Sequence, residues 1–255
     1  MSLCKQCFCG VRHDGAPEGK WEVYGGVRCY VATPTVDYPK NKVVLYLSDV
    51  FGPGLINAQL LTDDFARNGF RTIAPDYFNG DPIPEGTLLH PGDPSATLEF
   101  DVMKWFGNHG QAQTRPILDS LINALKEEGV TEFAAAGYCF GARYVFDLAY
   151  DDVIKVAATS HPSLLHIPAD LEKYASIAKA PLLINSCIDP QFPLEAQAKA
   201  DEILGNGKFA PGYVREFFEG CSHGFAVRGD LSDPKVKAGK ERAFKYTVEW
   251  FLKHL

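Results

Sequence analysis

Short runs of aliphatic residues alternate along the chain with longer segments in which apolar residues recur at helical spacing. The strand-like runs are rich in Val, Leu, Ile and Ala and lie at residues 42–48, 71–74, 132–136, 154–160, 181–187 and 214–218. Amphipathic segments of helical period lie between most of them. This alternation is typical of a parallel sheet that is covered by helices on both faces. We therefore predict an α/β fold with a mostly parallel central sheet.

Proline and glycine mark the ends of the predicted helices. A helix predicted over residues 116–128 begins with Pro116 and is followed by Gly129. Proline suits the first turn of a helix and glycine suits the position after its last turn. The segment 57–68 ends at a glycine in the same way. A last helix is predicted over residues 234–254, where apolar residues fall on one face.

Two segments depart from this alternation. Residues 21–32 alternate in polarity and carry Gly25 and Gly26 at a turn position, which predicts a β-hairpin at the edge of the sheet. Residues 77–97 are rich in proline and glycine. A long connection of this kind inside a compact domain is usually a functional lid or rim loop. We expect substrate choice to depend on this loop.

The composition is that of an ordinary globular protein. Hydrophobic residues make up 46% and charged residues 22% of the 255 positions, which is enough apolar surface for a substantial core. Because α/β folds of this length commonly form one unit, we expect residues 1–255 to be a single domain. The net charge of -7 disfavours nucleic acid and anionic membranes as binding partners. The net charge does not exclude a small-molecule substrate.

The cellular compartment is suggested by three features. The chain lacks an apolar run of the roughly 18 residues that a membrane span needs. Its first ten residues do not have the basic and then apolar layout of a signal peptide. The seven cysteines are odd in number and scattered, which favours reduced thiols over a disulfide framework. We therefore expect a cytosolic location.

Residues 137–141, Gly-Tyr-Cys-Phe-Gly, connect a predicted buried strand to a helix-like segment. This is the layout of a nucleophile elbow, with Cys139 where serine usually lies. The glycines let the tight turn form and let the next helix pack closely. The N-terminus of that helix is expected to lower the pKa of the Cys139 thiol. The alternative for so short a pattern is a buried, inert thiol in a turn.

Two further residues make the elbow more specific. Asp189 and His223 each follow a predicted strand, so both are expected at the same edge of the sheet as Cys139. The chain order of nucleophile, acid and histidine is that of α/β-hydrolases. In such a triad the thiolate attacks, the imidazole moves the proton and the carboxylate fixes the imidazole tautomer. We predict Cys139 as the nucleophile, His223 as general base and then acid, and Asp189 as the residue that orients it.

Longer motifs extend this picture over nearly the whole chain. They are SDVFGPG at 48–54, APDYFNGDP at 74–82, GYCFGAR at 137–143, SHPS at 160–163, DPQFP at 189–193 and CSHGF at 221–225. In this combination the chain resembles the dienelactone hydrolases of the α/β-hydrolase superfamily, particularly their fungal members. The resemblance implies an α/β-hydrolase fold and hydrolysis of small carboxylic esters or lactones through an acyl-thioester intermediate. It maps the Cys-His-Asp triad onto the three residues above, and we expect no cofactor.

The resemblance also implies further site residues. The backbone amides of Val50 and Phe140 would form an oxyanion hole, in which each donor contributes roughly 3 kcal/mol. Relatives of the bacterial chlorocatechol-pathway enzyme carry a glutamate where this chain has Asp49, which is one methylene shorter, and we assign Asp49 as an auxiliary carboxylate. The arginine with which those enzymes hold a substrate carboxylate is missing from residues 77–81, YFNGD. Arg228 is the remaining candidate cation, so a neutral ester or lactone is as plausible a substrate as an acid.

Several aromatic and histidine side chains are assigned to the substrate pocket. With Arg228, the residues are Tyr77, Phe78, His161, Phe192 and Phe225. For the aromatic residues the alternative is core packing. His161 is a rival base, but its place in the chain order does not fit the triad, so we favour a supporting or pocket role for it.

A thiol-based redox-sensing or binding protein on the same scaffold is the competing hypothesis. Low-pKa thiolates such as that expected for Cys139 are also oxidised by peroxides. This reading requires a resolving cysteine, for which Cys187 and Cys221 are the nearest guesses, although packing is the simpler role for both.

The N-terminal cluster of Cys4, Cys7, Cys9 and His13 could supply four soft ligands for zinc. A structural zinc site usually takes two separated ligand pairs, and the chain offers no evident second pair. We therefore predict no metal and interpret the cluster as a structural or redox-sensitive tail. A monomer or homodimer is expected.

Overall fold

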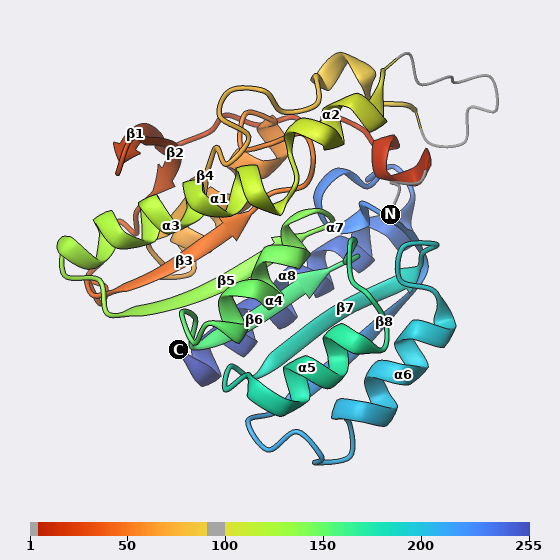
Figure 1. Cartoon of the computed structure of the whole chain (residues 1–255). Coiled ribbons are helices and arrows are strands. Elements are labelled where there is room, and N and C mark those ends of the chain that lie inside the picture. The colour runs from red at the N-terminus through yellow and green to blue at the C-terminus, as the bar shows by residue number, and fades with distance from the viewer. Residues whose placement is uncertain (1–4, 91–99) are drawn as a thin grey trace.

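The computed structural model describes residues 5–90 and 100–255, in which strands and helices alternate as the hydrophobic pattern predicts (Figure 1). The strands are β1 (Lys20–Tyr24), β2 (Val27–Ala32), β3 (Lys42–Leu47), β4 (Thr72–Pro75), β5 (Glu132–Tyr138), β6 (Val156–Ser160), β7 (Leu182–Ile188) and β8 (Tyr213–Ser222). The α-helices are α1 (Ile56–Arg67), α2 (Val102–Asn108), α3 (Gln111–Glu127), α4 (Gly141–Tyr150), α5 (Ala169–Ile177), α6 (Leu194–Leu204), α7 (Phe225–Arg228) and α8 (Pro234–His254). Two 3₁₀ helices are η1 (Lys5–Phe8) and η2 (Glu85–Thr87).

The strands form one mostly parallel sheet. Their order is β1-β2-β4-β3-β5-β6-β7-β8. Strands β1 and β2 form the predicted hairpin at the edge, and Gly25 and Gly26 occupy its turn with φ of 58° and 80°. Strand β2 pairs antiparallel with β4, and the pairs from β4 to β8 are parallel. The predicted α/β class and the parallel sheet are therefore confirmed.

Helices cover both faces of this sheet. In Figure 1, α4 and α5 lie in front of the central strands and α8 lies behind them. Helix α1 shares the face of α8, since the ring of Phe65 packs 4.8 Å from that of Phe244 and 5.9 Å from that of Phe251. The residues Ala134, Ala135 and Ala136 of β5 are buried between the two layers. A strand that is covered on both faces has a continuous apolar sequence, and this sequence predicts β5.

One predicted boundary is wrong. Helix α3 begins at Gln111, so Pro116 lies inside the helix and does not start it. Gly110 is instead the N-cap of the helix, and its extended backbone places its carbonyl to accept hydrogen bonds from the amides of Gln113 and Thr114, both at 3.0 Å. Proline has a φ that suits a helix, and its missing N–H removes only one hydrogen bond. The ends of α1 and α8 agree with the predicted helices.

The N-terminal segment packs against the described part of the Pro/Gly-rich loop. The amide of Leu89 donates to the carbonyl of Phe8 at 2.8 Å, and the amide of Gly10 donates to the carbonyl of Leu89 at 3.0 Å. Residues 91–97 of the predicted loop lie outside the described residues. These contacts hold η1 next to the loop.

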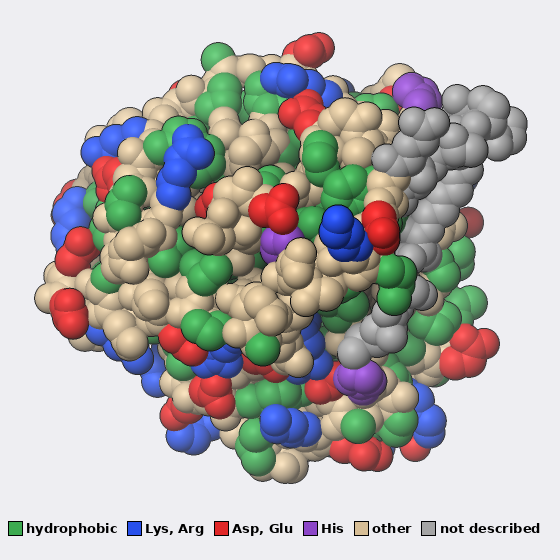
Figure 2. Space-filling view, turned by 45° about the horizontal axis from the view of Figure 1, so that its top comes forward, with side chains coloured by type: hydrophobic (Ala, Val, Ile, Leu, Met, Phe, Trp, Pro, Cys, Tyr) green, Lys and Arg blue, Asp and Glu red, His purple; other side chains and the backbone are tan. Residues whose placement is uncertain are grey.

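The surface in Figure 2 carries acidic and basic side chains interspersed over the described residues of that face. Among the helices of the described residues, none combines the length and the apolar character needed to cross a lipid bilayer.

Candidate active site

Cys139 lies in the turn between β5 and α4. Its φ of 51° is in the left-handed region, which residues other than glycine seldom adopt. Two backbone hydrogen bonds hold the turn. The Cys139 amide donates to the carbonyl of Ser160 at 3.2 Å, and the amide of Ser163 donates to the carbonyl of Cys139 at 3.1 Å. A strained residue between strand and helix is the geometry of a nucleophile elbow.

Two glycines allow this elbow to form. A Cβ atom on Gly141 would lie 2.1 Å from the carbonyl oxygen of Leu47, at the end of β3. A Cβ atom on Gly137 would lie 2.5 Å from Cγ2 of Val145 in α4. Both contacts are far shorter than van der Waals distance. Only residues without a side chain therefore let α4 begin so close to the ends of β3 and β5.

His223 and Asp189 form a buried hydrogen bond. The Nδ1–H group of His223 donates to Oδ2 of Asp189 at 2.7 Å, and the other carboxylate oxygen accepts from the amide of Gln191 at 2.8 Å. Asp189 follows β7, whereas His223 lies in the turn between β8 and α7. Because Asp189 engages Nδ1, the imidazole is held with Nε2 pointing away from the carboxylate.

Cys139 and His223 come together with a third side chain, Cys7 of η1. The two sulfur atoms and one ring nitrogen of His223 all lie within 4.8 Å of one another, and all three residues are buried. Since Nδ1 is bonded to Asp189, the ring nitrogen facing the sulfurs is Nε2, which has no hydrogen-bond partner at ordinary distance. The three predicted triad residues are thus neighbours at one edge of the sheet, and Cys7 is an addition that the sequence reasoning missed.

The charges around Cys139 favour its thiolate. Burial alone would raise the pKa of the Cys139 thiol, but a hydrogen bond from Cys7 and the positive charges of His223 and Arg228 outweigh it and hold that pKa well below its usual value. Burial alone would lower the pKa of His223, but the negative charges of Cys139 and Asp189 raise it to about 10. The arrangement therefore favours a thiolate beside an imidazolium, which is the reactive form of a cysteine nucleophile.

Asp49 and Arg228 form a buried ion pair next to this site. The guanidinium of Arg228 donates to Oδ2 of Asp49, while Oδ1 of Asp49 accepts from the amide of Phe51 at 3.1 Å. Burial raises the pKa of the Asp49 carboxyl, and this effect exceeds the opposing effect of Arg228. The Asp49 carboxylate, assigned from the sequence as an auxiliary group, is therefore paired with a cation in this structure.

Arg228 also holds the N-terminal segment. Its Nε–H donates to the carbonyl of Cys9 at 2.9 Å, and its second terminal nitrogen donates to the carbonyl of Cys7 at 2.7 Å. The side chain of Arg228 is fully buried. Arg228, the candidate cation for a substrate carboxylate, thus donates its hydrogen bonds to Asp49 and to the backbone. No local signal in the sequence links Arg228 to Cys7, because the two lie at opposite ends of the chain.

The four N-terminal residues weighed as zinc ligands do not gather around one point within the described residues. His13 donates or accepts through Nε2 at the carbonyl of Gly229, 2.8 Å away, while Cys7 lies with Cys139 and His223. Cys4 lies outside the described residues.

The two backbone amides expected in the oxyanion hole lie beside the elbow. Val50 follows β3 and Phe140 follows Cys139, and both residues are buried. Within the described part of the chain, neither amide donates a hydrogen bond to another group. Two unengaged amides at the ends of adjacent strands can serve a developing negative charge. Their role stays a prediction.

The predicted pocket aromatics are buried, and two of the four pack against Phe140. The ring of Tyr77 stacks 6.0 Å from that of Phe140, and Phe78 packs 5.1 Å from it. Phe225 packs on His161 with ring centroids 5.8 Å apart, and Phe192 is buried. Core packing is therefore one demonstrated role of these aromatic residues, while contact with a substrate stays a prediction.

His161 packs against the candidate catalytic histidine. Its ring meets that of His223 edge to face, with centroids 4.9 Å apart. Both ring nitrogens of His161 are buried without a hydrogen-bond partner among the described residues. Burial, together with the positive charges of His223 and Arg228, lowers the pKa of His161 well below its usual value. A neutral imidazole packed edge to face against His223 supports the position of that ring.

Two cavities border the site. One of about 320 Å³ is lined by Cys9, His223, Phe225 and Arg228 among others, and so reaches the candidate catalytic histidine. Another of about 260 Å³ lies behind Phe140 and Tyr144, with His109 and Leu164 on its wall. Cys139 itself is fully buried.

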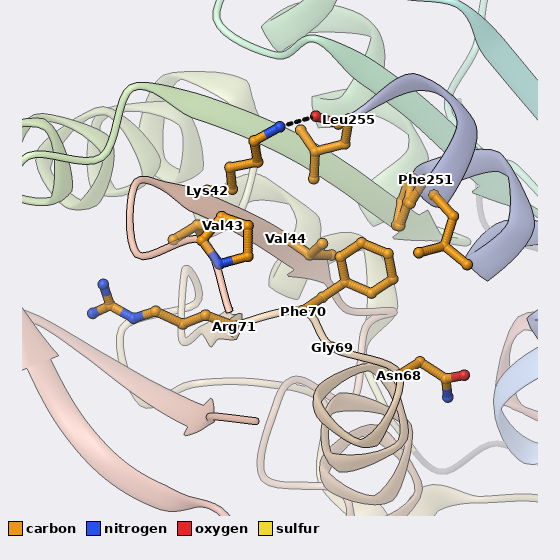
Figure 3. A pocket seen from close by; sticks show the side chains of 11 residues that line it. Lys42, Val43, Val44, Asn68, Gly69, Phe70, Arg71, Phe251 and Leu255 are labelled. Carbon is orange, nitrogen blue, oxygen red and sulfur yellow. Dashed lines mark hydrogen bonds between the residues drawn. The ribbon is translucent and has the colours of Figure 1, made fainter. Parts of the chain in front are cut away.

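The pocket in Figure 3 lies at the other end of β3. Its walls include Lys42, Val43 and Val44 at the start of that strand, together with Phe251 and Leu255, and its volume is about 220 Å³. Asp49 lies two residues beyond the other end of β3, so the length of the strand separates this pocket from the elbow.

The other buried thiols differ from Cys139. Burial, with a smaller contribution from Asp189, raises the pKa of the Cys187 thiol, and burial raises that of Cys221 to about 11. Neither thiol has the environment of a reactive thiolate. The sequence suggests Cys187 or Cys221 as the resolving cysteine, whereas the thiol that lies beside Cys139 in the structure is that of Cys7.

Comparisons with known proteins place the chain in a family. A model of the dienelactone hydrolase family matches residues 27–255. Hydrolase pyvD of Aspergillus violaceofuscus is 33% identical over 251 residues, covering 98% of this chain and 96% of the relative. Hydrolase tropI of Talaromyces stipitatus is 34% identical over 259 residues, covering 98% of this chain and 95% of the relative.

A likeness to a solved structure supports the fold. A dienelactone hydrolase-like promiscuous phosphotriesterase from metagenomic libraries superposes with a TM-score of 0.66 at 19% identity, covering 94% of this chain and 99% of that one. At this identity the likeness bears on the fold alone, and it agrees with the α/β-hydrolase architecture.

Proposed function

The chain belongs to the dienelactone hydrolase family and is a carboxylic ester or lactone hydrolase, and we propose that it acts through a Cys139-His223-Asp189 triad and an acyl-thioester intermediate. One observation carries this proposal. The Nδ1 atom of His223 is bonded to Asp189 at 2.7 Å while its other ring nitrogen faces the Cys139 sulfur at the elbow. This is the mutual geometry that a nucleophile, a base and an orienting group require.

In the first half of the proposed reaction, the Cys139 thiolate attacks the carbonyl carbon of the ester or lactone. The amides of Val50 and Phe140 donate hydrogen bonds to the oxyanion that forms. His223 then transfers its Nε2 proton to the leaving alkoxide oxygen as the carbon–oxygen bond breaks. The products of this half are the alcohol and a thioester on Cys139. For a lactone, alcohol and acyl group remain one molecule.

In the second half, neutral His223 takes a proton from water as the water oxygen attacks the thioester carbonyl. The carbon–sulfur bond breaks and Cys139 leaves as a thiolate, which restores the thiolate–imidazolium pair and releases the carboxylic acid. Asp189 keeps its hydrogen bond to Nδ1 throughout. Because a thiolate leaves more easily than an amine anion, we propose ester or lactone substrates over amides.

A small, uncharged substrate fits the site better than an acid. The donors of Arg228 are directed to Asp49 and to the carbonyls of Cys7 and Cys9, so they are engaged already. The cavity behind Phe140 and Tyr144 has mainly apolar walls and offers about 260 Å³ for an acyl or alcohol group. We therefore propose a neutral ester or lactone whose apolar part lies near Phe140.

The test compares hydrolysis of a small activated aryl ester by the wild type, by Cys139→Ala and by Cys29→Ala. Cys29 is equally buried but lies in β2, so its variant controls for the loss of a buried thiol. We expect Cys139→Ala to lose activity and Cys29→Ala to keep it. Equal activity of Cys139→Ala and the wild type would remove Cys139 as the nucleophile.

A thiol-based redox role is the second candidate, and the proximity of Cys7 to Cys139 is the observation that favours it. Replacing His223 separates the two functions. Ester turnover should collapse in His223→Ala if the triad operates, whereas oxidation of Cys139 by peroxide should slow, because the charge of His223 favours the thiolate, but should survive, because both thiols remain. Three other expectations stay proposals: a single domain, a cytosolic location, and a monomer or homodimer.

A further inference from the structure

The N-terminal segment places a second thiol, that of Cys7, in the site. Hydrolysis does not use this thiol. The reaction above needs one sulfur, yet Cys7 and Cys139 both lie within 4.8 Å of the same ring nitrogen of His223 and of each other. The three residues come from η1, from the elbow and from the turn after β8. Their side chains converge from three different elements, which is how proteins build compact ligand sets.

We propose that Cys7, Cys139 and His223 form a binding site for Zn²⁺, and that the bound ion switches the hydrolase off. Two thiolates and an imidazole are the ligands that zinc prefers over the hard cations Mg²⁺ and Ca²⁺. Three protein ligands leave a fourth position for water, as in zinc sites that are not purely structural. The binding itself depends only on the geometry of the cluster, whereas its inhibitory consequence rests on the proposed function.

The separations suit a tetrahedral ion. With zinc–sulfur bonds of about 2.3 Å, two sulfur ligands of a tetrahedral site lie ~3.8 Å apart, and a sulfur–nitrogen pair lies slightly closer. The three ligand atoms here all lie within 4.8 Å of one another, so small side-chain shifts close the set around an ion.

His223 is already oriented as a metal ligand. Its Nδ1–H donates to Asp189 at 2.7 Å, and Nε2 is buried without a hydrogen-bond partner at ordinary distance among the described residues. A carboxylate that holds the distal N–H of a histidine is the usual support of a zinc-binding imidazole. The buried Nε2 atom, which has no hydrogen-bond partner at ordinary distance among the described residues, therefore points toward the two sulfurs. Its lone pair can bind an ion once the Nε2 proton has been released.

Arg228 places Cys7 in the cluster. It donates to the carbonyl of Cys7 at 2.7 Å and to that of Cys9 at 2.9 Å, which fixes the segment on both sides of Phe8. The positive charge of Arg228 is balanced by the negative charge of Asp49, which reduces the repulsion between Arg228 and an incoming cation. The cavity of about 320 Å³ lined by Cys9, His223 and Arg228 borders the cluster at its histidine ligand.

The binding step balances in protons and involves no redox change. Zn²⁺ forms bonds to the sulfur of Cys139, already favoured as thiolate, to the sulfur of Cys7 and to Nε2 of His223. The Cys7 thiol and the His223 imidazolium each release one proton to solvent. The lone pairs that bind the ion are the ones that attack the ester and accept the proton in hydrolysis. Zinc and substrate turnover are therefore mutually exclusive.

The test begins with protein that is fully reduced and freed of metal, with the Cys7 and Cys139 thiols confirmed by titration. Zn²⁺ binding is measured by competition with a chromophoric chelator for the wild type, Cys7→Ser and Cys9→Ser. Cys9 is a matched control because it lies on the same segment but outside the cluster. We expect one tight ion per chain in the wild type and in Cys9→Ser, and an affinity reduced ~100-fold or more in Cys7→Ser, since even the loss of a supporting group costs 10–100-fold.

Co²⁺ serves as a spectroscopic probe of the same ligands. Sulfur-to-cobalt charge transfer should absorb in the near ultraviolet in the wild type and weaken in both Cys7→Ser and Cys139→Ala. Unchanged spectra in Cys7→Ser, or wild-type zinc affinity in that variant, would overturn the proposed site.

Inhibition is scored separately with the aryl ester. Zn²⁺ should abolish turnover of the wild type, a chelator should restore it, and Cys7→Ser should need ~100-fold more zinc for the same loss. If Cys139→Ala kept its esterase activity but lost zinc binding, the proposed catalytic role of Cys139 would fail while the metal site would stand. If zinc bound tightly without reducing the turnover of a Cys139-dependent enzyme, the inhibitory switch would be rejected.

Discussion

The carbonyl oxygen of Cys7 accepts a hydrogen bond from the guanidinium of Arg228 at 2.7 Å, so a fully buried arginine holds the N-terminal segment against the proposed nucleophile. The same guanidinium pairs with Asp49 after β3. One side chain thus connects the N-terminus, the end of a central strand and α7. Its loss should affect both the stability of the protein and the closure of the site.

Replacing Arg228 by methionine should lower the free energy of unfolding by about 3–5 kcal/mol, because it leaves the Asp49 carboxylate buried without its partner. Urea denaturation measures this change. Arg67→Met is the matched control, since Arg67 pairs with Asp64 at the exposed surface and such pairs contribute roughly 0–1 kcal/mol. Equal losses in the two variants would contradict the assigned role of the buried pair.

The thiolate of Cys139 should form at unusually low pH. The folded protein holds the pKa of this thiol well below its usual value, so the thiolate is present above that lowered pKa and is lost only as the pH falls through it. The ultraviolet thiolate absorbance of the wild type, minus that of Cys139→Ala, reports this titration. A midpoint near the ordinary cysteine value of about 8.5 would show that the surrounding charges do not stabilise the thiolate.

Ester hydrolysis should follow the same titration. As the pH falls through the lowered pKa of Cys139, the nucleophile is protonated and turnover should decline. At the alkaline side, turnover should decline as His223, whose pKa is raised to about 10, loses the proton that it donates to the leaving group. A rate profile that rises steadily above pH 10 would argue against a thiolate–imidazolium pair as the active form.

His161→Phe should separate a supporting role from a catalytic one. The ring nitrogens of His161 are buried without partners among the described residues, and phenylalanine keeps a ring of similar shape against His223. We expect equal or greater stability, by up to about 1–3 kcal/mol, because the cost of two unsatisfied polar atoms disappears. The turnover number should fall by less than ~10-fold, whereas loss of a true general base costs roughly 10²–10⁴-fold.

Gly141→Ala should destabilise the elbow severely. Its new Cβ would lie 2.1 Å from the carbonyl oxygen of Leu47, a backbone atom that cannot move without shifting β3. Thermal and urea unfolding should show a loss of several kcal/mol, or the variant should fail to fold. Gly107→Ala in α2 is the control, because its Cβ meets no neighbouring atom within 4 Å and alanine favours helix by roughly 0.5–1 kcal/mol. Similar behaviour of both variants would show that the close approach of α4 to β3 is not what requires glycine.

The buried strands, the hairpin and most helices could be located from the sequence, because each leaves a local signal of period, length or turn residues. Strand β5 is an example, since burial on both faces turns it into an unbroken run of small apolar residues. The start of α3 could not be located in this way. Pro116 has the residue type that is typical of a helix start, but the helix begins at Gln111, directly after its N-cap Gly110. The backbone geometry at Gly110 decides this boundary, and the residue types around it do not reveal that geometry.

The candidate triad could also be proposed from the sequence, because each member follows a strand and the carboxyl ends of parallel strands meet at one edge. The chain by itself therefore determined the fold class, the elbow and the order of Cys139, Asp189 and His223. Only the tertiary structure decided that Cys7 joins Cys139 and that Arg228 serves Asp49 and the N-terminal backbone. Such contacts join residues far apart in the chain through packing and charge, which act across space and leave no periodic trace along the sequence.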